Sequence, residues 1–398
     1  MIAVMAKKQK APVAAPPPDS PVVRVTRRIP QFVMIQLFVR AGGRCEFDGC
    51  NQNLLEHPLT LEAGNFAEMA HIVAFKREGP RGEEGARPED VNSASNLMLL
   101  CPTCHKAIDR QPSAYPRARL EQFKRLHEER IALVTDIGPD RKTATLILKA
   151  PIGGQLTAIS DEQVFRAVLP RYPSSRGGTV IDLSDLAGIR EKDEFLKVAI
   201  ERTNKLADGF IDGGEGSKVG HLSILALGPI PLLVHLGSRL SNKIPSDFFQ
   251  LHRDTQDWVW KTGGDVVKFR SRLVREGPAG SPVAVLLPLS GSIPVESLPE
   301  PLRSDGWLYE LGLEGRTPDP TFLRLRDDLD AFRVAYQELL GILAERHGLQ
   351  TSIELIPAIP APIAVLCGRE RLPKVHPALR VYDFDRTAGG YNYRIEVA

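Results

Sequence analysis

The stretches CEFDGC (residues 45–50) and NLMLLCPTCHKAID (residues 96–109) decide the fold of the first part of this chain. Together they hold four of the five cysteines of the 398-residue sequence, arranged as two pairs. A structural zinc ion takes four ligands in a tetrahedron, and two thiolate pairs from the two ends of a small module supply them. The spacing therefore predicts one zinc site formed by Cys45, Cys50, Cys101 and Cys104.

The second cysteine pair is followed directly by His105, and Asp109 comes one helical turn later. On a helix, residues i and i+4 lie on the same face, so these two side chains can bind one divalent ion. His71, in the sequence EMAHI, and Asn96 fall in the same short segment. The segment thus predicts one metal site that holds the fold and a second that takes part in chemistry.

This layout resembles the HNH (ββα-metal) nucleases over residues 27–136, an α+β module in which a hairpin and a helix are stapled together. The resemblance implies that His71 is the general base that deprotonates water and that His105 binds the catalytic ion. Asn96 would orient the base or brace the loop. The ion, magnesium or a transition metal, would neutralise the charge that develops on the attacked phosphate of double-stranded DNA.

The sequence departs from the HNH pattern at one position. Many HNH enzymes carry an Asp or His ligand immediately before the base, and this chain has Ala70 there. Asp109, or Glu68 on the same face of a strand, is the expected substitute. The alternative for the whole module is a zinc knuckle with a purely structural role.

Length and composition indicate a soluble globular protein of two or three domains, with 42% hydrophobic and 25% charged residues. No apolar run approaches the roughly 18 to 20 residues of a membrane span, so we expect no membrane association. The start of the chain does not have the order of a secretory signal, and the cysteines have metal-type spacing. Both observations favour the reducing cytoplasm.

Local signals divide the chain into four segments: a disordered Pro- and Ala-rich tail (1–22), the HNH module (23–137), a linker (138–142) and a second region (143–398). The first 142 residues hold 21 Lys and Arg against 17 Asp and Glu, a net +4 that is compatible with phosphate contacts.

Two helices and one loop are predicted within the HNH module. Pro30 opens a helix over 31–41, and Gly42 closes it. The loop 75–93 is rich in Gly, Pro and charge, so we expect it to be exposed and mobile. A second helix opens at Pro116, and its core positions are predicted to be Leu120, Phe123, Ile131 and Val134.

Beyond the linker, short apolar strands alternate with amphipathic helices, a pattern typical of α/β layers, here in two halves of about 120 residues. The stretch SIELIPAIPAPIAVLCG (352–368) is predicted as strand. Open α/β sheets bind ligands at the carboxyl ends of their strands. The loops contain neither GxGxxG nor a Walker A motif, so nothing favours nicotinamide or ATP binding.

The motifs LALGPIPLLVHLGSRLSNKIPSDFFQLHRDTQDWVWK, VAVLLPLSGSI and IELIPAIPAPIAVLCGRERLPK resemble the SAVED domain, two fused CARF-like Rossmannoid halves that sense cyclic oligonucleotides. The resemblance spans residues 143–398. With the module in front, the chain resembles an HNH–SAVED effector of bacterial CBASS anti-phage defence. The resemblance implies a cyclic di- or trinucleotide activator, a homo-oligomer that is a dimer at rest and larger with ligand, and DNA cleavage without strong sequence preference that ends in abortive infection.

A phosphodiester ring with purine bases favours cations and aromatic stacking. On that ground the residues nominated for the messenger pocket are Gln250, His252, Arg253, Trp258, Ser290, Arg369 and Tyr382. The alternative is that Trp258 and Trp260 are core residues and that Arg253 pairs with Asp254 or Asp257.

Two other functions remain open to the sequence. The first is a zinc-dependent, ligand-responsive DNA-binding regulator that cuts nothing. The second is a metabolic enzyme with a nucleic-acid tether, which lacks support because no set of nucleophile, base and orienting residue stands out after residue 143.

Overall fold

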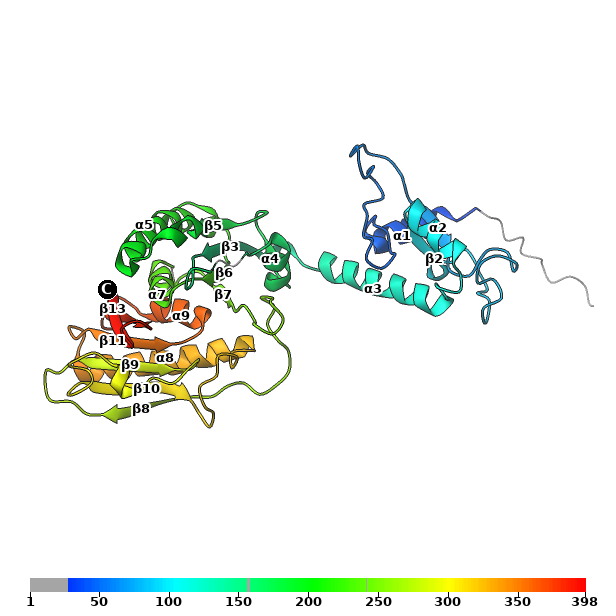
Figure 1. Cartoon of the computed structure of the whole chain (residues 1–398). Helices are drawn as coiled ribbons and strands as arrows, with labels where there is room; N and C mark the ends of the chain where they lie inside the picture. The colour runs from blue at the N-terminus through cyan, green and yellow to red at the C-terminus, as the bar shows by residue number, and fades with distance from the viewer. Residues whose placement is uncertain (1–27, 156–157, 241) are drawn as a thin grey trace, which may run out of the picture. The chain divides into compact units, whose positions relative to one another are not determined.

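The computed structural model describes residues 28–155, 158–240 and 242–398 (Figure 1). The chain divides into two compact units after Asp136, called here unit 1 and unit 2. The predicted disordered tail (1–22) lies outside the described residues. Among the described helices, none combines the length and apolarity needed to cross a bilayer.

Unit 1 is a small α+β module. Its elements are α1 (Gln31–Ala41), β1 (Glu68–His71), a 3-10 turn η1 (Ala94–Asn96), β2 (Leu97–Leu100), α2 (Pro102–Arg110) and α3 (Arg117–Thr135). β1 and β2 pair antiparallel, with His71 opposite Leu97. The hairpin and α2 together form the ββα arrangement that the sequence motif predicts.

The ends of the helices in unit 1 follow local sequence signals. α1 begins directly after Pro30 and ends at Gly42, whose φ of 60° lies in the left-handed region and whose amide donates to the carbonyls of Phe38 and Val39. At α2, the Cys101 side chain accepts a hydrogen bond from the Cys104 amide and Pro102 fills the first helical position. Both helix starts put proline where its missing N–H costs nothing.

The core positions predicted for α3 are correct in its first half and wrong at Val134. Leu120 and Phe123 are buried in the core of unit 1, and the buried face of the helix ends at His127. Val134 is 49% exposed, because the last turns of α3 extend beyond that small core.

Unit 2 contains two sheets that share one hydrophobic core. The first sheet is wholly parallel, in the order β4-β3-β6-β7, and β5 pairs with the end of β3. Its strands are β3 (Lys142–Lys149), β4 (Tyr172–Pro173), β5 (Thr179–Asp182), β6 (Leu222–Leu227) and β7 (Ser246–Phe249). Its helices are α4 (Asp161–Val168), α5 (Lys192–Ile211), α6 (Glu215–Lys218) and α7 (Ile230–Arg239).

The second sheet has the order β13-β12-β11-β9-β10-β8, with antiparallel pairs only at its two edges. Its strands are β8 (Phe269–Arg275), β9 (Val283–Pro288), β10 (Trp307–Leu313), β11 (Ile353–Ala358), β12 (Leu379–Asp385) and β13 (Gly390–Val397), and its helices are α8 (Arg326–His347) and α9 (Ala361–Glu370). The edge strand β8 is exposed along most of its length. Two α/β halves therefore follow one another, as the sequence predicts.

The stretch 352–368 is only half strand. Residues 353–358 form β11, but the apolar run that follows is α9, so the strand prediction was wrong there. The physical reason is tertiary: α9 is buried along almost its whole length against α7, and a helix satisfies its own backbone in that position.

α7 and α9 lie side by side between the two sheets (Figure 1). Each follows a strand and a proline-containing turn, and each has glycine as its eighth residue. A Cβ atom added to Gly237 would lie 1.9 Å from the carbonyl oxygen of Val365, and one added to Gly368 would lie 1.8 Å from that of Val234. The two halves of unit 2 therefore meet through direct backbone contact.

This crossing predicts an effect of adding a single methyl group. Gly368→Ala is expected to destabilise unit 2 by roughly 3 kcal/mol, since the contacted atoms are backbone and cannot rotate away. Gly341→Ala is the matched control, because Gly341 is exposed on α8 with open space around it, and it should be neutral or stabilising by up to about 1 kcal/mol. Urea unfolding of both variants measures the difference, and equal stability would contradict the crossing.

Candidate functional site

The four paired cysteines converge on one point in unit 1. Their sulfur atoms lie within 4.8 Å of one another, and the Sγ atoms of Cys50 and Cys101 are 4.0 Å apart. Tetrahedral zinc holds sulfur at about 2.3 Å, which the spacing of this cluster accommodates. Burial raises the pKa of the Cys45 thiol to about 12, so a thiolate there needs a cation beside it. The cluster can hold one metal ion.

His71 ends β1, and its ring is held by a residue that the sequence motif did not single out. The Nε2 atom donates to Oδ1 of Asn92 at 3.0 Å. With the proton on Nε2, the lone pair lies on Nδ1, which can accept a proton from water. The only sequence signal for Asn92 is its place in DVNSASN, four residues before the predicted Asn96.

Asn96 braces the loop after β1. Its Oδ1 accepts from the Val73 amide at 2.9 Å, and its Nδ2 donates to the carbonyls of Val73 and Val91 at 3.0 and 2.9 Å. The side chain is buried and fully used by these three bonds. Asn96 thus contacts the loop and not the ring of His71, whereas Asn92 contacts that ring.

His105 lies between two carboxylates on the other side of the motif. Its Nδ1 is 2.7 Å from Oε2 of Glu68, and its Nε2 is 3.4 Å from Oδ2 of Asp109. The hydrogen bond to Asp109 raises the pKa of His105, and the same bond lowers the pKa of Asp109. Glu68 and Ala70 share one face of β1, so Glu68 reaches the helix where alanine cannot.

Arg81 ties the hairpin to α2, and nothing in the sequence pointed to it. Its Nε donates to the carbonyl of Ile72 at 2.7 Å, its Nη1 to that of Ile108 at 2.8 Å, and its Nη2 lies 3.4 Å from Asp109. The side chain is 1% exposed. Burial lowers the pKa of Arg81, and the neighbouring Asp109 raises it.

The composition of the loop 75–93 predicted that it is exposed. The structure shows instead that parts of the loop are held by hydrogen bonds. Besides Arg81, it is fixed where the Arg117 amide donates to Glu84 at 3.1 Å and the Arg117 guanidinium to the carbonyl of Ala86 at 2.6 Å. Two arginines, Arg81 and Arg117, thus tie this Gly- and Pro-rich loop to the rest of unit 1.

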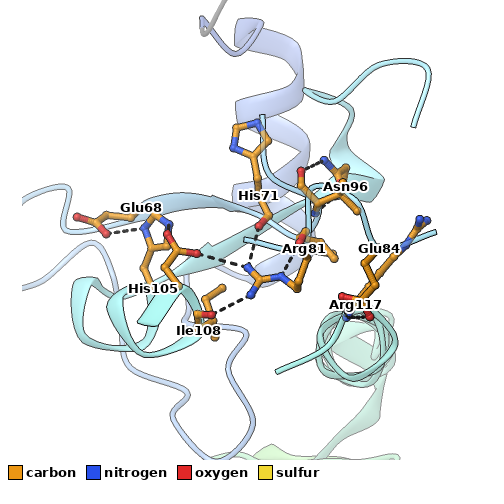
Figure 2. Close-up of polar contacts among 11 residues, drawn as sticks. Glu68, His71, Arg81, Glu84, Asn96, His105, Ile108 and Arg117 are labelled. Carbon is orange, nitrogen blue, oxygen red and sulfur yellow. Dashed lines mark hydrogen bonds and ion pairs between the residues drawn. The ribbon is translucent and has the colours of Figure 1, made fainter. Parts of the chain in front are cut away.

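Figure 2 shows how these groups are arranged around β1. The backbone carbonyl of His71 faces Arg81, while its ring points away from the pair formed by Glu68 and His105. The histidine ring and the helix-borne histidine thus lie on different sides of the strand.

In unit 2, one stretch concentrates unsatisfied buried polar atoms. Ten buried side-chain atoms among the described residues have no hydrogen-bond partner, and four of them are Gln250 Oε1, His252 Nε2, Trp258 Nε1 and Trp260 Nε1. Gln250 follows directly after β7, so the stretch lies at the carboxyl end of the first sheet. Buried donors and acceptors without partners are rare, and each calls for a ligand or water that supplies one.

The nominated residues in this stretch differ in burial: Trp258 belongs to the core, and Arg253 is exposed. Trp258 is 1% exposed and packs against Ile147, Val164 and Leu225, as the core alternative has it. Arg253 is exposed and forms no ion pair with any described residue, because Asp254 pairs with Arg324 and Asp257 with Lys261.

The other three nominated residues lie elsewhere. Ser290 donates its amide to the Ala358 carbonyl at 2.7 Å, at the carboxyl ends of β9 and β11. Arg369 holds the start of β7 through Ile244 and Ser246, and Tyr382 is buried in the second sheet. The structure therefore does not bring all seven residues to one pocket.

The hairpin, the helix with its histidine and the four clustered cysteines give unit 1 the arrangement of the ββα-metal class of nuclease modules. Comparison with known families agrees: residues 45–111 match the HNH endonuclease family, and residues 205–397 match the SAVED family, described as the SMODS-associated sensor domain fused to various effectors. Residues 45–111 of the chain thus form an HNH endonuclease domain, whose family acts as a hydrolase, and residues 205–397 form a SAVED domain of α/β architecture.

Solved structures similar to the chain include the Cap4 SAVED/CARF-domain receptors. The Acinetobacter baumannii receptor with the cyclic trinucleotide 2'3'3'-cAAA is 13% identical, with a TM-score of 0.39 over 77% of this chain and 64% of that one. The Moraxella osloensis receptor is 13% identical, with a TM-score of 0.38 over 80% and 71% of the two chains. This chain spans just under two thirds of the first of these. No curated protein matches it.

The cysteine cluster predicts metal-dependent folding of unit 1. Purified protein should carry about one zinc ion per chain, and Cys101→Ser should lose it and unfold unit 1, since binding free energy is folding free energy at such sites. Cys367→Ala is the control, because the fifth cysteine is buried in unit 2 and should leave the metal content unchanged. Elemental analysis and thermal unfolding measure both. A metal-free preparation with a cooperative unit 1 would overturn the assignment.

Proposed function

We propose that the chain is a cyclic-oligonucleotide-activated, metal-dependent DNA endonuclease of largely non-sequence-specific action, working in anti-phage defence of the CBASS type. The observation that carries the nuclease half is His105 on α2, held between Glu68 and Asp109, with the Nδ1 of His71 left free by Asn92. The matches to an endonuclease family and to a sensor-domain family support the two halves of the proposal. Abortive infection is the biological outcome that follows if cleavage is unrestricted.

The metal assignment follows from the two contacts of His105. A metal-bound imidazole usually donates its other N–H to a carboxylate. The short contact to Glu68 fits that N–H bond, and the longer 3.4 Å gap to Asp109 fits two ligands awaiting an ion. We assign His105 and Asp109 as ligands of the catalytic divalent cation and Glu68 as the residue that orients His105. When bound, a magnesium or similar ion neutralises charge on the attacked phosphate.

The remaining steps belong to the protein. Asn92 holds the His71 ring with its lone pair on Nδ1, and Nδ1 removes the proton from the attacking water. Arg81 holds the carbonyls of Ile72 and Ile108, so the strand that carries His71 and the helix that carries His105 keep their spacing. Zinc in the cysteine cluster has a structural role, because all four of its positions are taken by sulfur.

The messenger site is proposed at the carboxyl end of the first sheet. Three buried polar atoms there have no hydrogen-bond partner among the described residues: Gln250 Oε1, His252 Nε2 and Trp260 Nε1. Arg253 adds an exposed cation. A cyclic di- or trinucleotide carries base edges and phosphates that can satisfy all of them. Because a ligand shifts an equilibrium only as far as it prefers one state, we propose that the messenger favours a larger homo-oligomer over a resting dimer.

Replacing the base tests the chemistry. His71→Ala should reduce plasmid cleavage by roughly 100-fold or more, the scale of general-base catalysis, with zinc content unchanged. His57→Asn is the control, since His57 Nδ1 only accepts from the amides of Leu59 and Thr60, a role that asparagine can keep. Cleavage by His71→Ala at more than a few per cent of wild type would place the base elsewhere. Wild-type protein that retains DNA with messenger and metal but never cuts would favour the regulator alternative.

Removing an orphaned polar atom tests the messenger site. Gln250→Met keeps the side-chain size, so stability without ligand should be equal or higher, while messenger affinity should fall at least 10-fold. Gln350→Met, exposed after α8 and outside the proposed messenger site, is the control. Light scattering and plasmid cleavage across one titration with a panel of cyclic di- and trinucleotides give affinity, assembly and activation together. Full cleavage without ligand, or unchanged affinity in Gln250→Met, would contradict the proposal.

A further inference from the structure

Unit 2 contains a cavity of about 530 Å³ that none of the functions above uses. It lies at the amino ends of the first sheet: Lys142 begins β3, His221 precedes β6 and Pro245 precedes β7. The stretch proposed for the messenger lies at the opposite, carboxyl end. Small-molecule sites typically enclose about 300 to 1,000 Å³, so the cavity has the size of a ligand site.

The lining of this cavity carries more positive than negative side chains. Lys142, Arg171 and Lys218 face it, against the single carboxylate of Asp140. Neither lysine forms an ion pair with any residue that the structure describes, and Asp140 already lies 3.6 Å from Arg141. Surface lysines normally point into solvent, but here two unpaired ones and an arginine border one concave space.

His221 forms the floor of the cavity without adding charge. Its Nδ1 lies 3.0 Å from Oγ1 of Thr143, and its Nε2 lies 3.4 Å from Oδ2 of Asp247. Burial lowers the pKa of His221 to about 4, so the ring is neutral at pH 7. The positive potential therefore comes from the two lysines and Arg171.

We propose that this cavity binds a small ligand with a diphosphate or longer phosphate group, distinct from the messenger. Two lysines without an ion-pair partner among the described residues and one arginine line the cavity, and this excess of positive charge favours a multiply charged phosphate group over a neutral ligand. Guanidinium and ammonium groups bind phosphate oxygens through charge-assisted hydrogen bonds. A concave space of nucleotide size favours a small molecule over duplex DNA, which lies along open basic surfaces. The proposal does not depend on the nuclease or messenger assignments.

The position of the cavity gives the ligand a way to influence both halves of unit 2. Nε of Arg171 lies 3.6 Å from Asp247, and the same carboxylate pairs with Arg326 at the start of α8 in the second half. A phosphate that binds Arg171 competes with Asp247 for it. The neighbouring Tyr172 donates its hydroxyl to the carbonyl of Pro139 at 3.3 Å, so the segment that begins unit 2 belongs to the same group of contacts.

Pyrophosphate is the probe for this site, titrated calorimetrically into the full-length protein. The double variant Lys142→Ala/Lys218→Ala should bind it at least 10-fold more weakly than wild type. Lys197→Ala/Lys205→Ala is the matched control, since it removes two exposed lysines from α5 of the same half and should bind as wild type does. Any binding of pyrophosphate to metal in unit 1 is common to both variants and cancels in the comparison.

Three further measurements make the outcome decisive. Arg171→Gln should weaken pyrophosphate binding as well, with unfolding midpoints reported for each variant so that misfolded protein is identified. Gln250→Met should leave pyrophosphate affinity unchanged, which separates this site from the messenger site. Equal affinity of the two double variants would overturn the proposal. It would also be overturned if Lys142→Ala/Lys218→Ala weakened binding of a short DNA duplex but left pyrophosphate binding unchanged.

Discussion

Four sulfur atoms that converge within 4.8 Å constrain the rest of unit 1. Cys45 follows α1, and Cys101 caps α2, so one bound ion fixes two elements that are distant in sequence. The amide of His105 donates to the carbonyl of Cys101 at 3.0 Å, one helical turn after the cap. A metal held by the four thiolates would therefore set the position of His105, the histidine proposed for catalysis. Buried thiolates and the cation stabilise each other, so neither half of this arrangement is expected to persist alone.

The features that could be predicted from the sequence are those with local causes. Pro30 and Gly42 set the two ends of α1 through contacts within one helical turn. The spacing of the cysteine pairs likewise indicates a shared metal ion from a short motif. The alternation of strands and helices in unit 2 likewise follows from the hydrophobic periodicity and the length of each segment. His71, His105 and Asp109 could be nominated because they lie within short motifs of fixed spacing.

The features that could not be predicted depend on contacts between distant residues. Arg81 is one of several arginines in a polar loop, and only the folded hairpin and α2 give its guanidinium four acceptors. Asn92 has no spacing rule that marks it as the partner of His71. In α9, an apolar run with strand-like composition is helix because it is buried against α7, where a helix satisfies its own backbone hydrogen bonds. For the stretch from Gln250 to Trp260, residue types pointed to a site, but the missing partners are visible only once the chain is folded.

The outer strand of the second sheet limits how copies of this chain can associate. β8 exposes Arg270 and Arg272 beside Leu273 and Val274, and Arg272 pairs with Glu310 of the neighbouring strand. Two copies aligned along this edge would bring like charges opposite one another, which disfavours joining the sheets into one continuous ribbon. The charges on this edge thereby form a barrier against irreversible fibre growth.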